Sequence, residues 1–114
     1  MRFGYTHRAF LDHCEYFVAV GKHLEEASLS AIAAETALQS RHAGLRNEAV
    51  AQYRRADWNL TRVVTTLNVA DGNADNLTRI EQLAFERSES AARIEVAGLR
   101  STLLSISERL SGIG

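Results

Sequence analysis

The sequence of 114 residues contains no proline, one cysteine, one lysine and one tryptophan. Without proline, no position is barred from a helix interior by a fixed φ and a missing amide hydrogen. The lone Cys14 excludes an internal disulfide and a zinc site made of several cysteines, so a reducing compartment is expected. No apolar run approaches the ~20 residues that span a bilayer, and the first residues lack a signal peptide's apolar core. We therefore expect a soluble, cytoplasmic protein.

Aromatic residues are scarce, and neither sign of charge dominates, because the formal net charge is −1. A slightly acidic chain without a lysine-rich segment does not resemble a protein that holds nucleic acid by its overall charge. The hydrophobic share of 46% and the charged share of 24% are typical of a globular chain. We therefore expect one folded domain over residues 1–114, with a single core that is marginal in size and would gain from oligomerisation.

The periodicity of the apolar residues predicts helices and gives little sign of strands. Gly44 and Gly72 mark the two connections, because glycine commonly follows the last turn of a helix. We expect helices over residues 6–42, 47–70 and 75–111. The polar residues expected to cap the second and third helices are Asn47 and either Asp75 or Asn76.

Apolar residues recur in each predicted helix at alternating spacings of four and three, the pattern of one buried face. The first line contains weak positions, so a break within residues 21–30, giving a fourth helix, is the alternative. The lines are Phe10, Cys14, Phe17, Gly21, Leu24, Ser28, Ala31, Glu35 and Leu38; then Ala49, Tyr53, Ala56, Leu60, Val63, Leu67 and Ala70; then Leu77, Ile80, Ala84, Ala92, Val96, Leu99, Leu103, Ile106, Leu110 and Ile113. We expect an all-α antiparallel bundle of three long amphipathic helices, or four, with coiled-coil character.

The end of the third line keeps heptad spacing over about three repeats, near the length at which a coiled coil is suspected. A seam of this kind can pair with a second copy of the chain and produce an oligomer. Our candidate residues for self-association are Leu99, Leu103, Ile106 and Leu110. On the same helix, Glu89 precedes Arg93 by four residues, the order that favours an ion pair.

Charge is distributed unevenly along the chain. Residues 41–70 contain five arginines and two acids, whereas residues 1–40 and 71–114 each carry a net charge of −2. The only tryptophan, Trp58, falls outside the apolar line of this basic segment and has arginines on either side of it on the helix. Tryptophan and arginine dominate the energetics of protein interfaces. The candidate partner-binding residues are therefore Arg54, Arg55, Trp58 and Arg62, and burial of Trp58 under another helix is the alternative.

Two enzymatic alternatives rest on the histidines. Arg8 and His13, in "RAFLDH", have the arginine, four residues, histidine spacing of HEPN ribonucleases, and this resemblance implies phosphodiester cleavage by the pair. His42, in "HAGLRNEA", resembles the exposed histidine of a helical histidine phosphotransfer domain, with Arg46 available to a phosphate. The basic residues 41–70 leave DNA or RNA binding as a third alternative, which the overall acidity disfavours.

The apolar faces of long helices suit the binding of another helix better than the enclosure of a small molecule, because no glycine-rich phosphate loop or convergent polar cluster is present. No two histidines stand three or four residues apart, so no metal and no cofactor are expected. Our leading hypothesis is a non-enzymatic protein-interaction module: a small adaptor, an inhibitor, or a helical chaperone of a secretion apparatus. Its partner would be another protein, helical or acidic. The arginine bias is typical of a GC-rich bacterial or phage genome.

Overall fold

The computed structural model describes the backbone of residues 2–40 and 44–112, and side chains from residue 8 onward within these ranges. Three long helices account for most of them: α1 (Arg2–Gln39), α2 (Gly44–Gly72) and α3 (Arg79–Gly112). A short 3₁₀ helix, η1 (Ala74–Asn76), connects α2 to α3. No strand occurs in the described ranges, so the prediction of an all-α fold with three packed helices is confirmed. Because α1 continues through residues 21–30, the considered break does not occur there.

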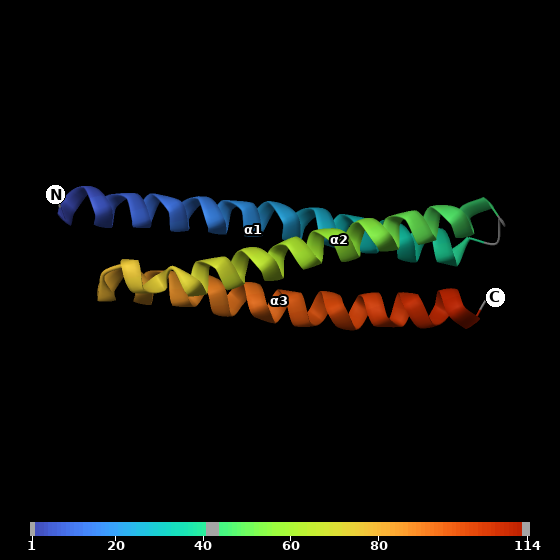
Figure 1. Cartoon of the computed structure of the whole chain (residues 1–114). Coiled ribbons are helices and arrows are strands. Elements are labelled where there is room, and N and C mark those ends of the chain that lie inside the picture. The colour runs from blue at the N-terminus through green and yellow to red at the C-terminus, as the bar shows by residue number, and fades with distance from the viewer. Residues whose placement is uncertain (1, 41–43, 113–114) are drawn as a thin grey trace.

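The three helices lie side by side in an elongated molecule of 62 × 18 × 16 Å (Figure 1). Helix α2 returns along α1, since His13 contacts Ala70 and His23 contacts Asn59. Helix α3 returns along α2 in the same way, and Arg93 of α3 reaches Asp71 at the end of α2. The packing of α1 against α2 is the most extensive, and α3 lies along both.

Helix α3 begins with a capping box, in which a threonine and a glutamate each bond the other's backbone amide. The Thr78 amide donates to Glu81 Oε1 at 2.8 Å, and the Glu81 amide donates to Thr78 Oγ1 at 3.2 Å. This arrangement satisfies two of the amide groups that a helix start leaves without partners. The prediction that Asp75 or Asn76 caps this helix is wrong, because both residues belong to η1. The loop expected around Gly72 is also shorter, since α2 continues to that residue.

The buried line of α1 differs from the predicted one at every second position. Leu24 and Ala31 are buried as expected, but the alternate positions lie one residue earlier than predicted. Apolar side chains therefore fill the core positions that the prediction gave to a glycine, a serine and a glutamate. The structure buries Val20, Ala27 and Ala34, whereas Gly21, Ser28 and Glu35 lie outside the core.

Small side chains dominate the contact between α1 and α2. The buried alanines are Ala27, Ala31, Ala34 and Ala37 of α1, and Ala49, Ala56 and Ala70 of α2. A methyl group allows two helix backbones to approach more closely than a leucine does, since side-chain size sets the distance between packed helices. Larger residues fill the space where α3 joins the pair, and the largest fully buried apolar side chains are Leu67, Ile106 and Val63.

The predicted line of α2 is confirmed, because every residue in it is buried except Tyr53, which packs partly buried against the core. In α3 the prediction holds only for the second half. Ile80 is 80% exposed and Ala84 is exposed, while Phe85 turns inward instead. The last residue of the predicted line, Ile113, lies outside the described residues.

The seam proposed for self-association is used within one chain. Leu103 and Ile106 are buried in the core, and Leu99 and Leu110 pack against it. These side chains hold α3 against the other two helices, so they do not form an exposed surface for a second copy.

The alanine-lined contact leads to a stability prediction. Ala34 is fully buried, so Ala34→Leu should destabilise the fold by about 1–3 kcal/mol, because added methylenes force the two helices apart. Urea unfolding measures the effect. The control is Ala51→Leu on the exposed side of α2, which should change stability by less than about 0.5 kcal/mol. Equal effects of the two substitutions would contradict close packing at Ala34.

Candidate functional site

Trp58 lies on the surface of α2 with 58% of its area exposed. The alternative in which another helix of this chain buries it therefore does not occur. Arg54, Arg55 and Arg62 are exposed as well. The guanidinium carbon of Arg62 lies 5.7 Å from the centre of the indole ring, within the range of a cation–π contact. The four residues predicted from the sequence thus share one exposed region, with an arginine held over the tryptophan.

Two residues that the sequence did not single out support Trp58 from below. The ring of His23, on α1, meets the indole edge-on with 5.9 Å between ring centres. His23 Nδ1 lies 2.8 Å from Oδ1 of Asn59, which is 1% exposed. Since Asn59 Nδ2 donates to the Arg55 carbonyl at 3.0 Å, its Oδ1 is left to accept, and Nδ1 of His23 carries the donated proton. The indole therefore packs against a histidine that is hydrogen-bonded across the contact between α1 and α2.

A shallow hollow of about 220 Å³ continues this region by one helical turn. Arg55 lines it from α2, and Leu29 and Glu26 line it from α1. Leu29 is itself an exposed apolar side chain. We call the four predicted residues, together with His23 and this hollow, the Trp58 surface. It combines an exposed indole, an exposed leucine and three guanidinium groups along the α1–α2 contact.

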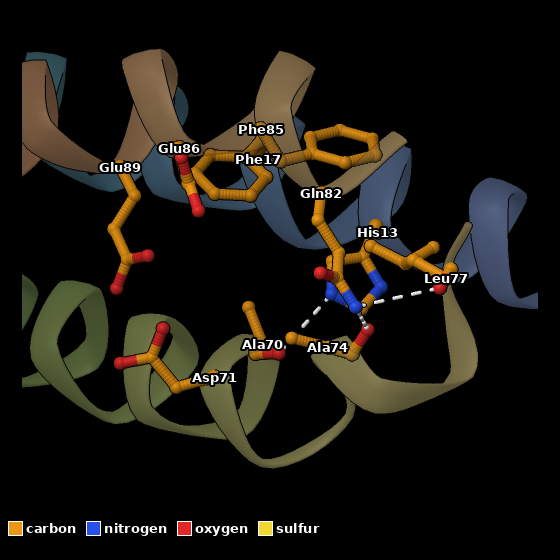
Figure 2. A pocket seen from close by; sticks show the side chains of 10 residues that line it. All are labelled: His13, Phe17, Ala70, Asp71, Ala74, Leu77, Gln82, Phe85, Glu86 and Glu89. Atoms are coloured by element: carbon orange, nitrogen blue, oxygen red, sulfur yellow. Dashed lines mark hydrogen bonds between the residues drawn. The ribbon is translucent and has the colours of Figure 1, made fainter. Parts of the chain in front are cut away.

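A second hollow lies near the end of the bundle where η1 connects α2 to α3, and it has a volume of about 150 Å³ (Figure 2). Phe17 and Phe85 form one wall, with their rings stacked at 5.3 Å between centres. The carboxylates of Asp71, Glu86 and Glu89 lie on one side, and His13 lies on the other. No group of three or more histidine, cysteine or acidic side chains in the described part of the chain is arranged to hold a metal ion.

His13 is 2% exposed, and both of its ring nitrogens face backbone carbonyls. Nδ1 lies 3.2 Å from the oxygen of Ala9, and Nε2 lies 3.1 Å from the oxygen of Ala70. Arg8 and His13 do line one hollow of about 130 Å³, as the ribonuclease alternative requires. The imidazole nevertheless has no ring nitrogen open to a substrate or to a phosphoryl group. His42, the histidine that resembles that of a phosphotransfer domain, lies outside the described residues.

The acidic side of the second hollow is only partly neutralised. Arg93 pairs with Asp71 at 2.8 Å and with Glu89 at 2.9 Å, and the latter is the ion pair predicted from the sequence. Burial and the neighbouring Asp71 raise the pKa of the Glu89 carboxyl, while Arg93 acts in the opposite direction. The single guanidinium group of Arg93 therefore pairs with two carboxylates that repel each other.

Comparison with known proteins adds no functional assignment, because no family model, curated protein or solved structure matches this chain. Within residues 2–40 and 44–112, no helix is sufficiently long and apolar to cross a membrane.

The raised pKa of Glu89 predicts a pH dependence. A group whose pKa is higher in the folded state stabilises the fold below its ordinary pKa, here 4.5, and this contribution is lost as the pH rises through the folded-state pKa. The free energy of unfolding of the natural chain, relative to Glu89→Gln, should therefore decrease as the pH rises from about 4 to about 7. Urea titrations at a series of pH values measure it.

The matched control for this pH dependence is Glu95→Gln, which changes an exposed carboxyl elsewhere on α3. Its stability relative to the natural chain should vary less over the same pH range. If the natural chain instead becomes more stable relative to Glu89→Gln as the pH rises, the pairing of Glu89 with Arg93 outweighs the burial of the carboxyl and its repulsion by Asp71.

Proposed function

We propose that this chain is a non-enzymatic protein-interaction module that binds an acidic helical segment of another protein through the Trp58 surface. Its three helices act as an antiparallel bundle with coiled-coil character, a rigid support for that surface. In this proposal the protein works in the cytoplasm of a bacterium or of a phage host. Its role there is that of a small adaptor, an inhibitor, or a helical chaperone of a secretion apparatus.

The observation that carries the proposal is the exposure of the single tryptophan in a fixed position. A largely exposed indole leaves apolar area in water that folding does not bury, and a partner can remove it from water. Contacts with His23 and Arg62 restrain the ring. A restrained side chain loses less conformational freedom on binding than a mobile one, which favours affinity. Tryptophan surrounded by arginine also matches the composition of interface hot spots.

The charge around Trp58 supports an acidic partner. Arg54, Arg55 and Arg62 are exposed, and neither ion pair recorded within the described residues involves any of them. Carboxylates of a partner would therefore find guanidinium groups that can form forked hydrogen bonds. Opposite charge across an interface also raises the rate of association.

The shape of the surface supports a helical partner. The hollow beside Arg55 and the exposed Leu29 extend the apolar area along the α1–α2 contact, in line with Trp58. An amphipathic helix lying along this direction would place apolar residues at intervals of three and four on Trp58 and Leu29. Its acidic residues would then reach the flanking arginines.

The test is affinity capture from an extract of the source cell, using the natural chain, Trp58→Ala and Thr65→Ala as baits. Thr65 is exposed on the same helix and provides the matched control. We expect Trp58→Ala to weaken the captured protein's binding by about 2 kcal/mol, or roughly 30-fold, because it removes the hot spot. Thr65→Ala should bind normally. Isothermal titration calorimetry with the purified partner measures the affinity of each bait, including Trp58→Ala, which contains no tryptophan.

Two further measurements make this test decisive. The urea midpoint of Trp58→Ala should match that of the natural chain, because the indole is exposed. Treatment of the extract with nuclease should leave the captured protein in place, which separates a protein partner from bound nucleic acid. The proposal fails if Trp58→Ala unfolds, or if it captures the same protein with unchanged affinity.

A further inference from the structure

Helix α3 carries a second apolar face, on the side opposite to the core. Ile80, Leu83, Ile94 and Leu104 are all exposed, and Ile94 is 73% exposed. At 100° per residue, Ile80, Leu83 and Ile94 fall on the side of the helix opposite to Ala92 and Val96, which are buried, and Leu104 lies at the edge of this side, where it lines a hollow with α2. We call these four residues, with Arg87 between them, the outer face of α3. It extends over about seven turns, or about 36 Å.

The molecule has enough unburied surface to form an interface there. Its accessible surface is 7792 Å², whereas a compact monomer of 12.6 kDa exposes about 6,200 Å². Its radius of gyration is 17.7 Å, compared with about 13 Å for a compact domain of this length. The excess of about 1,600 Å² exceeds the ~800 Å² that each partner buries in a standard interface. An interface along the outer face would therefore bury part of the surface that the narrow bundle leaves exposed to water.

The charges beside this face complement each other when two copies lie antiparallel. Glu86, Arg93 and Arg100 follow one edge at intervals of seven residues. A twofold axis near residue 93 places Glu86 of each copy beside Arg100 of the other. Arg93, at the axis, is already neutralised by Asp71 and Glu89. In a parallel twofold pair this edge lies on opposite sides of the interface in the two copies, so Glu86 and Arg100 come together only in the antiparallel arrangement.

The side chains of the face also fit this antiparallel register. With the axis near residue 93, Leu83 of one copy lies at the height of Leu103 of the other, one residue from its Leu104, and the two copies of Ile94 lie next to the axis. Arg87 lies at the height of Leu99, next to Gly98. Because Gly98 has no side chain, it leaves room for the aliphatic stem of Arg87 while the guanidinium group remains in water. Leucines thus meet near the two ends of the interface, and isoleucines meet at its axis.

We propose that the outer face of α3 binds a second copy of this chain, giving a twofold dimer with antiparallel α3 helices. The proposal is independent of the Trp58 surface, which lies over the α1–α2 contact. The self-association residues predicted from the sequence, Leu99 to Leu110, pack inside the chain. The proposed interface therefore lies on the opposite side of the same helix.

The first test is the mass in solution, measured by sedimentation equilibrium over a concentration series. The natural chain should approach twice 12.6 kDa as its concentration rises. Ile94→Glu should raise the dimer Kd at least ~10-fold, because it places two charges near the axis of the interface. Val18→Glu is the matched control, since Val18 is 72% exposed on α1, and it should leave the Kd unchanged. Circular dichroism verifies that both variants are folded.

The second test examines the orientation of the helices. In a dimer of Glu86→Arg, the introduced arginine of each copy lies beside Arg100 of the other. In a dimer of Arg100→Glu, the introduced glutamate of each copy lies beside Glu86 of the other. Each variant should therefore dimerise more weakly than the natural chain. An equimolar mixture should recover the dimer, because the heterodimer restores opposite charges at both positions.

The proposal is overturned if the natural chain stays monomeric up to about 1 mM, or if Ile94→Glu dimerises as well as the control. It is also overturned if the mixture of charge variants associates no better than each variant alone. Trp58→Ala should dimerise normally, so failure of the dimer and failure of partner binding are separate results.

Discussion

The close contact of α1 with α2 is the constraint on which the rest of the molecule depends. Its centre is lined by alanines, which lose no side-chain freedom on burial but each remove little apolar area from water. A contact of this kind must be long to be stable, and the two helices accordingly run together for most of their length. The resulting bundle is narrow, and α3 covers only part of it. Large apolar residues therefore remain on the surface, where they are available to partners.

Alanine faces are similar at many positions, so they define the alignment of two helices weakly. Buried polar contacts supply that alignment here. His13 meets the Ala70 carbonyl, and farther along His23 meets Asn59. Sliding α1 by one turn would leave these buried groups without partners, and an unsatisfied buried polar group costs about 1–3 kcal/mol. We infer that these contacts fix the alignment, and that this same alignment brings His23 under Trp58.

The sequence alone predicts the helices and the buried face of α2, because that face has a single consistent apolar line. Along α1, two lines share Leu24 and Ala31, and only the neighbouring helix decides between Val20 and Gly21. The capping box of Thr78 and Glu81 is visible in "TRIE", but polar residues just before it compete as caps. Helical spacing predicts that Arg54, Arg55 and Arg62 lie near Trp58. It does not predict that His23 and Asn59 support the indole, because their hydrogen bond joins residues 36 positions apart.

The two proposed interfaces lie on different sides of the bundle, and this separation has a functional consequence. Trp58 contacts α1, whereas Tyr53 and Leu60 of α2 line a hollow shared with α3. An α3-mediated dimer would therefore leave both Trp58 surfaces open, related by a twofold axis. A partner with two acidic helices, or two partners held together, could engage both at once. The second contact then forms at a high effective concentration, so two modest interfaces can produce tight binding without a deep pocket in either chain.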